Sequence, residues 1–257
     1  MLNIRYNIKF CLPDVIDEKD GVTSFEELYD LSLICRYIKE GSFEKLSEIF
    51  PNDFSMDKGR ILIVTGANQG GKTTFLKSIG IAQIFMQVGV HAAAKSFKSS
   101  PASYIATHFP REEDSNLTSG KLEEELRRLY EIFVSMKRNS FILFNEPFTT
   151  TTVKEGSSIA EDVIKALSYT RSRVVFVTHF YELASALYRL DKEADKENKK
   201  IHLYNGEKIA SLVAEVVKDP DAATVQGTYV RRTYGIIPGE PKIRVYADDI
   251  IKQYFCK

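Results

Sequence analysis

The stretch RILIVTGANQGGKT, residues 60–73, decides the fold. Residues 60–65 are rich in aliphatic and β-branched residues, as is typical of a buried strand. Residues 66–73 match the pattern G-x-x-x-x-G-K-[ST], which joins a strand to a helix and binds phosphate groups. The glycines let backbone N–H groups point at phosphate oxygens, and the following helix adds the positive end of its dipole. The stretch therefore predicts a nucleotide-binding α/β protein.

Two side chains of this loop have predicted roles toward ATP and Mg²⁺. Lys72 would reach the β- and γ-phosphates, and the Thr73 hydroxyl would bind the metal ion. A glycine-rich turn with an idle lysine is the alternative, and the flanking strand and helix patterns argue against it. The predicted nucleotide-binding residues are Gly66, Ala67, Asn68, Gln69, Gly70, Gly71, Lys72, Thr73 and Thr74.

A second motif is the stretch FILFNEP, residues 141–147, in which an apolar run ends in Asn145 and Glu146. Nucleotide hydrolases of this design place Asp-Glu at that position. A strand with this ending delivers its polar pair to the carboxyl edge of the sheet, where ligands bind. We expect Glu146 to polarise the attacking water as a catalytic residue, and Asn145 to lie at the Mg²⁺ site.

A third apolar strand, residues 173–178, is followed by His179. A histidine at a strand end is often only a hydrogen-bonded structural residue. Because two phosphate-handling motifs are predicted on neighbouring strands, we interpret His179 as a catalytic γ-phosphate sensor. His91, His108 and His202 lack such a context and are interpreted as structural.

The regions between these strands carry amphipathic helical patterns, over residues 120–138 and 155–170. Strands that alternate with helices indicate an α/β fold with a mostly parallel central sheet flanked by helices. We interpret the apolar stripe of the first helix as core packing, not as a cofactor site. The stripe consists of Leu122, Leu126, Leu129, Phe133 and Met136.

The rest of the chain is less specific. Residues 1–49 are expected to form a small, mainly helical leading segment, and residues 50–257 the nucleotide-binding domain. The charged run at residues 191–200 is interpreted as an exposed loop or helix end. Beyond it, Asn205-Gly206 predicts the two-residue turn of a hairpin.

Composition limits the partners. The chain has 257 residues with 35 basic and 35 acidic side chains, so its formal net charge is zero. A dedicated nucleic-acid binder usually has a basic excess, so DNA contacts are expected from regions outside this chain or from an assembled dimer. The three cysteines, Cys11, Cys35 and Cys256, show neither metal-ligand spacing nor a disulfide framework. With no long apolar run, these features predict a cytoplasmic protein without a membrane segment.

Taken together, the motifs resemble the C-terminal ATPase domain of the MutS family of DNA mismatch-repair proteins. Three stretches carry the likeness, at residues 50–80, 141–160 and 174–183, and residues 228–254 are similar to the closing helices of that domain. The resemblance implies an ABC-type P-loop ATPase fold. It also implies that two such domains pair, as a homodimer or with another ATPase domain, and that ATP turnover drives conformational change on DNA.

The resemblance also implies roles for single residues. Asn68 would contact the nucleotide, and Ile49 or Phe50 would flank the adenine. Residues 116–121, NLTSGK, lie where that family has a loop that reaches the γ-phosphate of the partner. Ser119 is therefore the trans-acting candidate, with capping of the 120–138 helix as the alternative.

This chain departs from the family pattern at Asn145, which replaces an Asp, and at residues 147–152, where PFTTTT replaces a glycine- and arginine-bearing loop. The mismatch-reading domains are not seen, so the chain is either a domain of a longer protein or a divergent MutS-like branch. Three functions are open: a slow ATPase for DNA repair, the same ATPase coupled to recombination control or transport, and a dimerisation switch with negligible hydrolysis. We favour the first, because Glu146 and His179 are retained.

Overall fold

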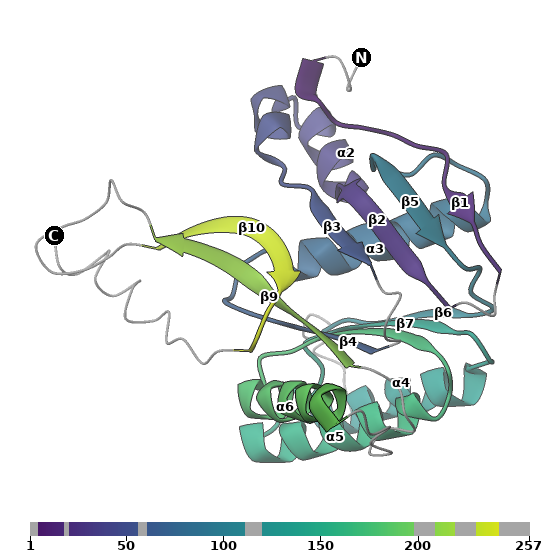
Figure 1. Cartoon of the computed structure of the whole chain (residues 1–257), viewed down its shortest axis with the longest axis vertical. Coiled ribbons are helices and arrows are strands. Elements are labelled where there is room, and N and C mark those ends of the chain that lie inside the picture. Colours follow the sequence, from purple (N-terminus) through teal and green to yellow (C-terminus); the bar gives the residue numbers. More distant parts are fainter. Residues whose placement is uncertain are drawn as a thin grey trace, which may run out of the picture.

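A computed structural model of the chain describes residues 5–17, 21–55, 61–110, 120–197, 209–218 and 230–241. Two sheets form its framework, one of six strands and one of four. Figure 1 shows them as two layers, with the smaller sheet lying beyond one face of the larger. The larger sheet runs, in spatial order, β10 (Val230–Pro238), β9 (Ile209–Lys218), β4 (Ile61–Thr65), β8 (Arg173–Val177), β7 (Phe141–Asn145) and β6 (Ile105–His108).

The central strands of the larger sheet are apolar along their whole length. Every residue of β4, β7 and β8 is buried, as expected for parallel strands that are covered on both faces. β9, β4, β8, β7 and β6 pair in parallel, and only β10 runs antiparallel to its neighbour β9. The predicted strands at residues 60–65, 140–145 and 173–178 are therefore confirmed within the described residues, and so is a mixed α/β fold with parallel strands.

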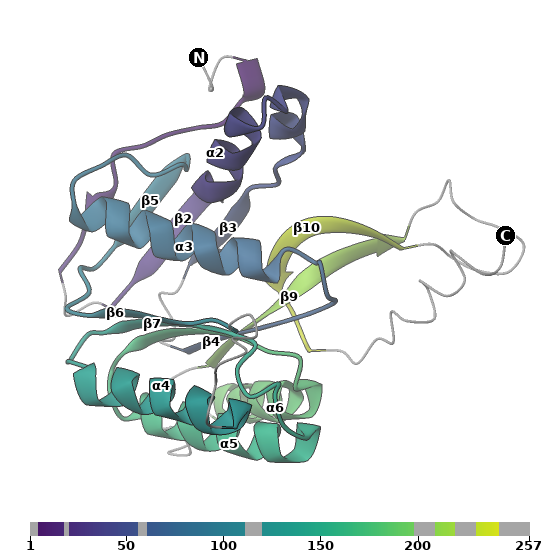
Figure 2. The same cartoon turned by 180° about the vertical axis from the view of Figure 1, so that it is seen from behind.

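Helices cover both faces of this sheet (Figure 2). On one face lie α4 (Lys121–Ser135), α5 (Val153–Ser168) and α6 (Tyr181–Glu197). On the other face lies α3 (Lys72–Gln87), which also contacts the four-stranded sheet. One apolar cluster fills each of these two interfaces, so the sheet has a core on either side.

The apolar stripe predicted for α4 needs one correction. Leu129 is buried, and Leu122, Phe133 and Met136 pack against the core as expected. Leu126, however, is 38% exposed, whereas its neighbour Glu125 is only 6% exposed. The inner face of the helix therefore includes a carboxylate at a position where the apolar pattern predicted a leucine.

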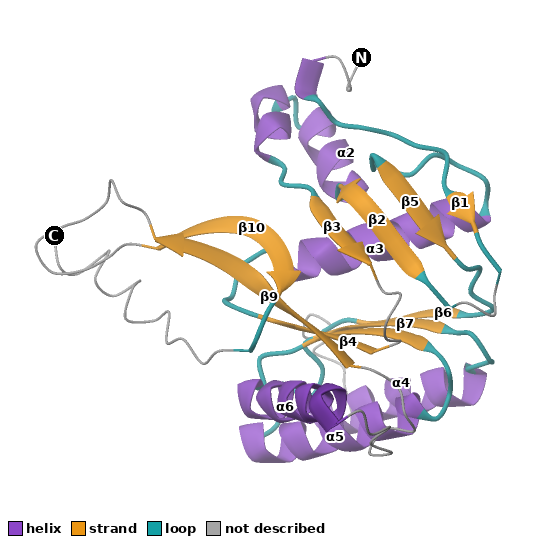
Figure 3. Ribbon diagram, in the orientation of Figure 1, coloured by secondary structure: helices purple, strands orange, loops and turns teal. Residues whose placement is uncertain are grey.

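The smaller sheet contains four short strands, none of which the sequence predicted. Their spatial order is β1 (Asp14–Val15), β5 (Ser96–Ser99), β2 (Thr23–Leu28) and β3 (Asn52–Ser55). Two helical segments, α2 (Leu31–Lys39) and η1 (Phe43–Glu48), lie beside them (Figure 3). Residues 1–49, expected to be mainly helical, contain β1 and β2 besides these two helical segments. β2 pairs with both β3 and β5, which ties this segment to later parts of the chain.

A buried arginine joins the two sheets. Arg173, at the start of β8, is fully buried and donates hydrogen bonds to Thr23 Oγ1 at 2.8 Å and to Ser99 Oγ at 2.7 Å. It also donates to the Ser100 carbonyl at 2.8 Å, and its guanidinium lies 4.9 Å from the centre of the Phe141 ring. These contacts connect the start of β8 to β2 and β5 of the smaller sheet and offset part of the cost of burying the charge.

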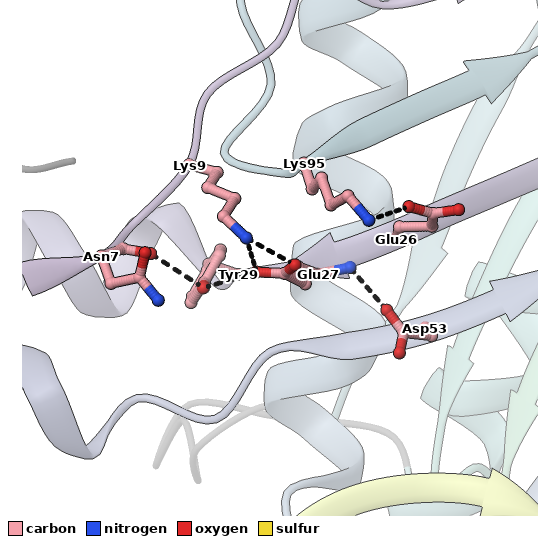
Figure 4. Close-up of polar contacts among 7 residues, drawn as sticks. All are labelled: Asn7, Lys9, Glu26, Glu27, Tyr29, Asp53 and Lys95. Carbon is pink, nitrogen blue, oxygen red and sulfur yellow. Dashed lines mark hydrogen bonds and ion pairs between the residues drawn. The ribbon is translucent and has the colours of Figure 1, made fainter.

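A polar cluster stabilises an irregularity in β2 (Figure 4). Glu27 has a left-handed backbone, φ 47°, at the register shift between Phe25 and Leu28. Its N–H donates to Asp53 Oδ1 at 2.6 Å, and its carboxylate accepts from Lys9 Nζ at 2.6 Å. The hydrogen bond from Lys9 holds the pKa of Glu27 below its usual value. These contacts lie on the smaller sheet and have a structural role.

The C-terminal predictions have mixed outcomes. Residues 230–238, assigned to closing helices by resemblance, form the strand β10. The charged run at residues 191–200 continues α6 as far as residue 197. The turn at Asn205-Gly206 lies outside the described residues. Among the helices that the structure describes, none has the length and apolar character needed to cross a bilayer.

Candidate nucleotide site

The loop between β4 and α3 needs glycine at its two ends. Gly66, with φ 133°, directly follows β4, and Gly71, with φ 90°, is the N-cap of α3. Neighbouring strands also approach these residues closely. A Cβ at Gly66 would lie 2.5 Å from Ala214 Cβ, and a Cβ at Gly71 would lie 3.0 Å from the Tyr234 carbonyl oxygen. The loop is therefore held against β9 and β10, which complete its walls.

Lys72 begins α3 and turns its amino group back into the loop. The residue is 4% exposed, and Nζ donates to the Gly66 carbonyl at 2.8 Å and to the Ala67 carbonyl at 2.9 Å. The same amino group lies 3.4 Å from a carboxylate oxygen of Glu146. The predicted phosphate-binding lysine and the predicted catalytic carboxylate are thus in contact.

Thr73 and Asn145 also meet, as their predicted shared role requires. The Thr73 hydroxyl donates a hydrogen bond to Asn145 Oδ1 at 3.0 Å. Because its proton is used in this bond, the lone pairs of the hydroxyl oxygen are available to a cation. Hydroxyl and amide oxygens are hard ligands of the kind that Mg²⁺ accepts alongside water and phosphate. The donor set at this position therefore fits a magnesium ion.

Glu146 directly follows β7 and has a strained backbone conformation. Its backbone is left-handed, with φ 49°, and its N–H donates to the Val177 carbonyl of β8 at 2.9 Å. Its side chain is 29% exposed, so the carboxylate can reach both Lys72 and solvent. Left-handed residues other than glycine are uncommon and cluster at functional sites.

His179 lies at the same edge of the sheet as Glu146 but makes different contacts. The preceding Thr178 donates its N–H to the Val64 carbonyl of β4 at 3.0 Å, which brings the end of β8 beside the loop. The half-buried His179 ring lies 4.8 Å from the Phe180 ring. The structure places it directly after β8, without a described contact to Lys72 or Glu146.

A cavity of about 320 Å³ lies over the loop. Its walls combine the loop, the end of β7 and one residue of β10. Its described lining consists of Asn68, Gln69, Gly70, Gly71, Lys72, Thr73, Thr74, Glu146 and Tyr234. Seven of the nine predicted loop residues therefore face one cavity, together with the predicted catalytic carboxylate.

Tyr234 is the lining residue that sequence reasoning missed. It has a left-handed backbone, φ 63°, and an exposed side chain. Its aromatic side chain is of a kind that can line a nucleotide site, but the sequence around it was assigned to closing helices. A Cβ at the next residue, Gly235, would lie 3.2 Å from Phe50 Cε1, so Phe50 lies beside this wall of the cavity.

Two other candidates have different outcomes. Ile49 is buried in a cluster with Ile34 and Leu46, whereas Phe50 is exposed, and neither belongs to the described lining of the cavity. Ser119 lies outside the described residues. The N-cap of α4 is Gly120, and no side-chain hydrogen bond caps this helix among the described residues.

Comparison with known proteins identifies the family. The model of "MutS domain V" matches residues 62–239. MutS protein homolog 4 of Mus musculus is 30% identical over 192 residues, which cover 69% of this chain and 20% of that protein. The DNA mismatch repair protein MutS of Leptospira interrogans is 31% identical over 160 residues, which cover 60% of this chain and 19% of that protein.

The chain has a mixed α/β fold, a glycine-rich loop between β4 and α3, and an acidic residue after β7. The family model matches most of its length. The chain belongs to the MutS family of DNA mismatch-repair proteins and corresponds to their C-terminal region. The matched residues include the loop, β7 and β8. The chain spans about a fifth of the length of the relatives it matches.

Proposed function

We propose that this chain binds ATP with Mg²⁺ in the cavity above the loop and hydrolyses it slowly, as an ABC-type ATPase unit. The observation that carries the proposal is the meeting of Lys72 and Glu146, 3.4 Å apart, in one cavity with Thr73. The lysine supplies positive charge for the β- and γ-phosphates, and the carboxylate supplies a base. The family match supports the proposal, since the matched residues contain all three.

Binding would use the backbone and two side chains of the loop. The N–H groups at the start of α3 and the dipole of the helix favour an anion at that end. Lys72 would add charge-assisted hydrogen bonds to phosphate oxygens. Thr73 and Asn145 would hold the Mg²⁺, which supplies neutralisation of the phosphate charge.

Hydrolysis would use Glu146 as the general base. Its carboxylate accepts a proton from a water molecule while the water oxygen bonds to the γ-phosphorus. The bond between that phosphorus and the bridging oxygen breaks, and ADP leaves with the electron pair. We assign His179 to sensing the γ-phosphate, because it follows β8 at the same edge of the sheet. Asn145 makes the reaction slow, because it lacks the charge with which an Asp would hold the metal.

A dimerisation switch that binds nucleotide with negligible hydrolysis is the second candidate. Asn145 favours it, because a neutral residue at the metal position weakens the site. The placement of Glu146 against Lys72 favours hydrolysis, because a site used only for binding has no need of a base there.

The cellular role would be DNA repair or recombination control. The relatives named above include proteins of DNA mismatch repair, and the chain covers about a fifth of them. With a net charge of zero, DNA contact would come from regions outside this chain or from a pair of such domains. Ser119, from the partner of such a pair, is the candidate donor to the γ-phosphate.

Steady-state phosphate release tests the proposal. The wild-type chain should release phosphate from ATP and Mg²⁺, and Glu146→Gln should abolish this release while it spares ATP binding. Glu182→Gln, which alters an exposed carboxylate on α6, is the matched control and should behave as wild type. ATP binding without phosphate release by the wild type would favour the switch instead.

A further inference from the structure

The feature of interest is the buried carboxylate of Glu125 on α4. Its Oε1 accepts a hydrogen bond from the Phe148 N–H at 2.8 Å, and its Oε2 accepts one from the Thr150 hydroxyl at 3.0 Å. Phe148 and Thr150 belong to the segment that directly follows Glu146. One carboxylate thus binds a helix to the segment that carries the proposed general base.

This segment is strained and is held at several points. Both Glu146, φ 49°, and Phe148, φ 63°, have left-handed backbones, which persist only where the surroundings enforce them. The Glu146 N–H is held by the Val177 carbonyl, and the Phe148 N–H by Glu125. From the side of α5, a Cβ at Gly156 would lie 2.5 Å from the Phe148 carbonyl oxygen, so the segment has little room to move.

The Glu125 carboxylate accepts these two hydrogen bonds and has a histidine beside it. His108 Nε2 lies 3.9 Å from Glu125 Oε1. Burial, and next the charge of Arg128, lower the pKa of His108, so the imidazole is neutral at pH 7. An apolar side chain would fill this inner position of α4 without the need to satisfy a charge. The carboxylate therefore has a more specific use than core packing.

We propose that Glu125 is a positioning residue for Glu146, which holds the segment after β7 in the conformation that presents the general base to the nucleotide. The inference rests on the proposed function, since it concerns the same hydrolytic site. Two hydrogen bonds connect α4 directly to the segment that carries Glu146. A shift of α4 would therefore be transmitted to the segment that carries Glu146.

The test compares kcat and KM for ATP among variants of the whole chain. Glu125→Ala should lower kcat about 10- to 100-fold with KM little changed, because a misplaced catalytic group slows chemistry while the loop still binds phosphate. Glu125→Gln should recover most of the loss, since its amide oxygen can accept from Phe148 and its amide nitrogen can donate to Thr150. Thr150→Val, which removes one of the two bonds at constant size, should lower kcat about tenfold or less. Glu131→Ala, an exposed carboxylate on the same helix, is the matched control.

Amide hydrogen exchange without nucleotide separates positioning from unfolding. In Glu125→Ala, the Phe148 amide should exchange faster, while the Glu146 amide and the core of the sheet remain protected. If Glu125→Ala turns ATP over at the wild-type rate, or if kcat falls together with a rise in KM and a loss of global protection, the inference is wrong while the proposed function stands. If the wild-type chain has no turnover, the proposed function fails and the inference fails with it.

Discussion

At the scale of single residues, Asn145 decides how fast the proposed site can work. An Asn presents the same carbonyl oxygen as an Asp but no negative charge toward the metal. A charge acting on a divalent ion at ~5 Å is worth several kcal/mol at an effective dielectric near 20, and desolvation reduces this value. Asn145→Asp should therefore lower the Mg²⁺ concentration needed for half-maximal phosphate release and leave turnover equal or faster. An unchanged Mg²⁺ requirement in a titration of phosphate release would show that Asn145 lies outside the metal site.

We expect His108 to make the free energy of unfolding depend on pH. Burial is the first cause of its lowered pKa, the charge of Arg128 adds to it, and Glu125 opposes it. The unfolded chain therefore binds this proton more readily, so the free energy of unfolding should decrease as pH falls below about 6.5. Denaturant unfolding between about pH 7.5 and 5.5 should show this decrease in wild type and a smaller one in His108→Phe. His91→Gln, which changes an exposed histidine, should keep the wild-type slope, and equal slopes in all three proteins would contradict the prediction.

Local spacing was enough to predict some residues of the site and not others. Lys72 and Thr73 are placed by the loop pattern itself, and Glu146 by the end of its strand, so their meeting could be expected. Tyr234 reaches the cavity only because β10 pairs with β9, a contact between strands that sequence patterns do not reveal. Glu125 occupies an inner position of α4 although its charge predicts an outer one. Such positions depend on a partner elsewhere in the chain.

At the scale of elements, the contact between the loop and β9 should limit what can replace Gly66. A Cβ there would meet Ala214 Cβ at 2.5 Å and the Ala214 backbone nitrogen at 2.9 Å, and the φ of 133° is strained for any other residue. Gly66→Ala should lower the free energy of unfolding by about 2–4 kcal/mol. Gly120→Ala, where nothing lies within 4 Å and φ is −62°, should change it by less than about 1 kcal/mol. Denaturant unfolding measures both, and equal stability of the two variants would show that β9 does not pack on the loop.

The elements that the sequence predicted are those with a strong local signal. β4, β7 and β8 are continuous apolar runs, and α4 and α5 have clear helical periodicity, so each was found. β2 and β5 are short and alternate between buried and exposed residues, and their pairing spans about 70 residues of sequence, so they were not found. β10 was read as helix by resemblance, since its strand character depends on pairing with β9.

At the scale of the whole molecule, we expect a second domain to complete the cavity. In the described part of the chain, Lys72 is the only cationic side chain that lines the cavity, although a triphosphate carries several negative charges. A second copy could supply further donors and so complete the site. Sedimentation of Glu146→Gln with ATP and Mg²⁺ should show dimers that Lys72→Ala does not form. A strictly monomeric Glu146→Gln at high concentration would contradict the composite site for this chain.

The central claim, that the loop at residues 66–73 binds the phosphates of ATP, is tested most directly by calorimetry. Wild type should bind ATP with Mg²⁺, and Lys72→Ala should bind about 10- to 100-fold more weakly, because it loses the charge-assisted hydrogen bonds of the lysine. Lys77→Ala, which removes an exposed lysine from the same helix, should bind as wild type does. If Lys72→Ala binds ATP as tightly as wild type, the assignment of this loop to phosphate binding is wrong.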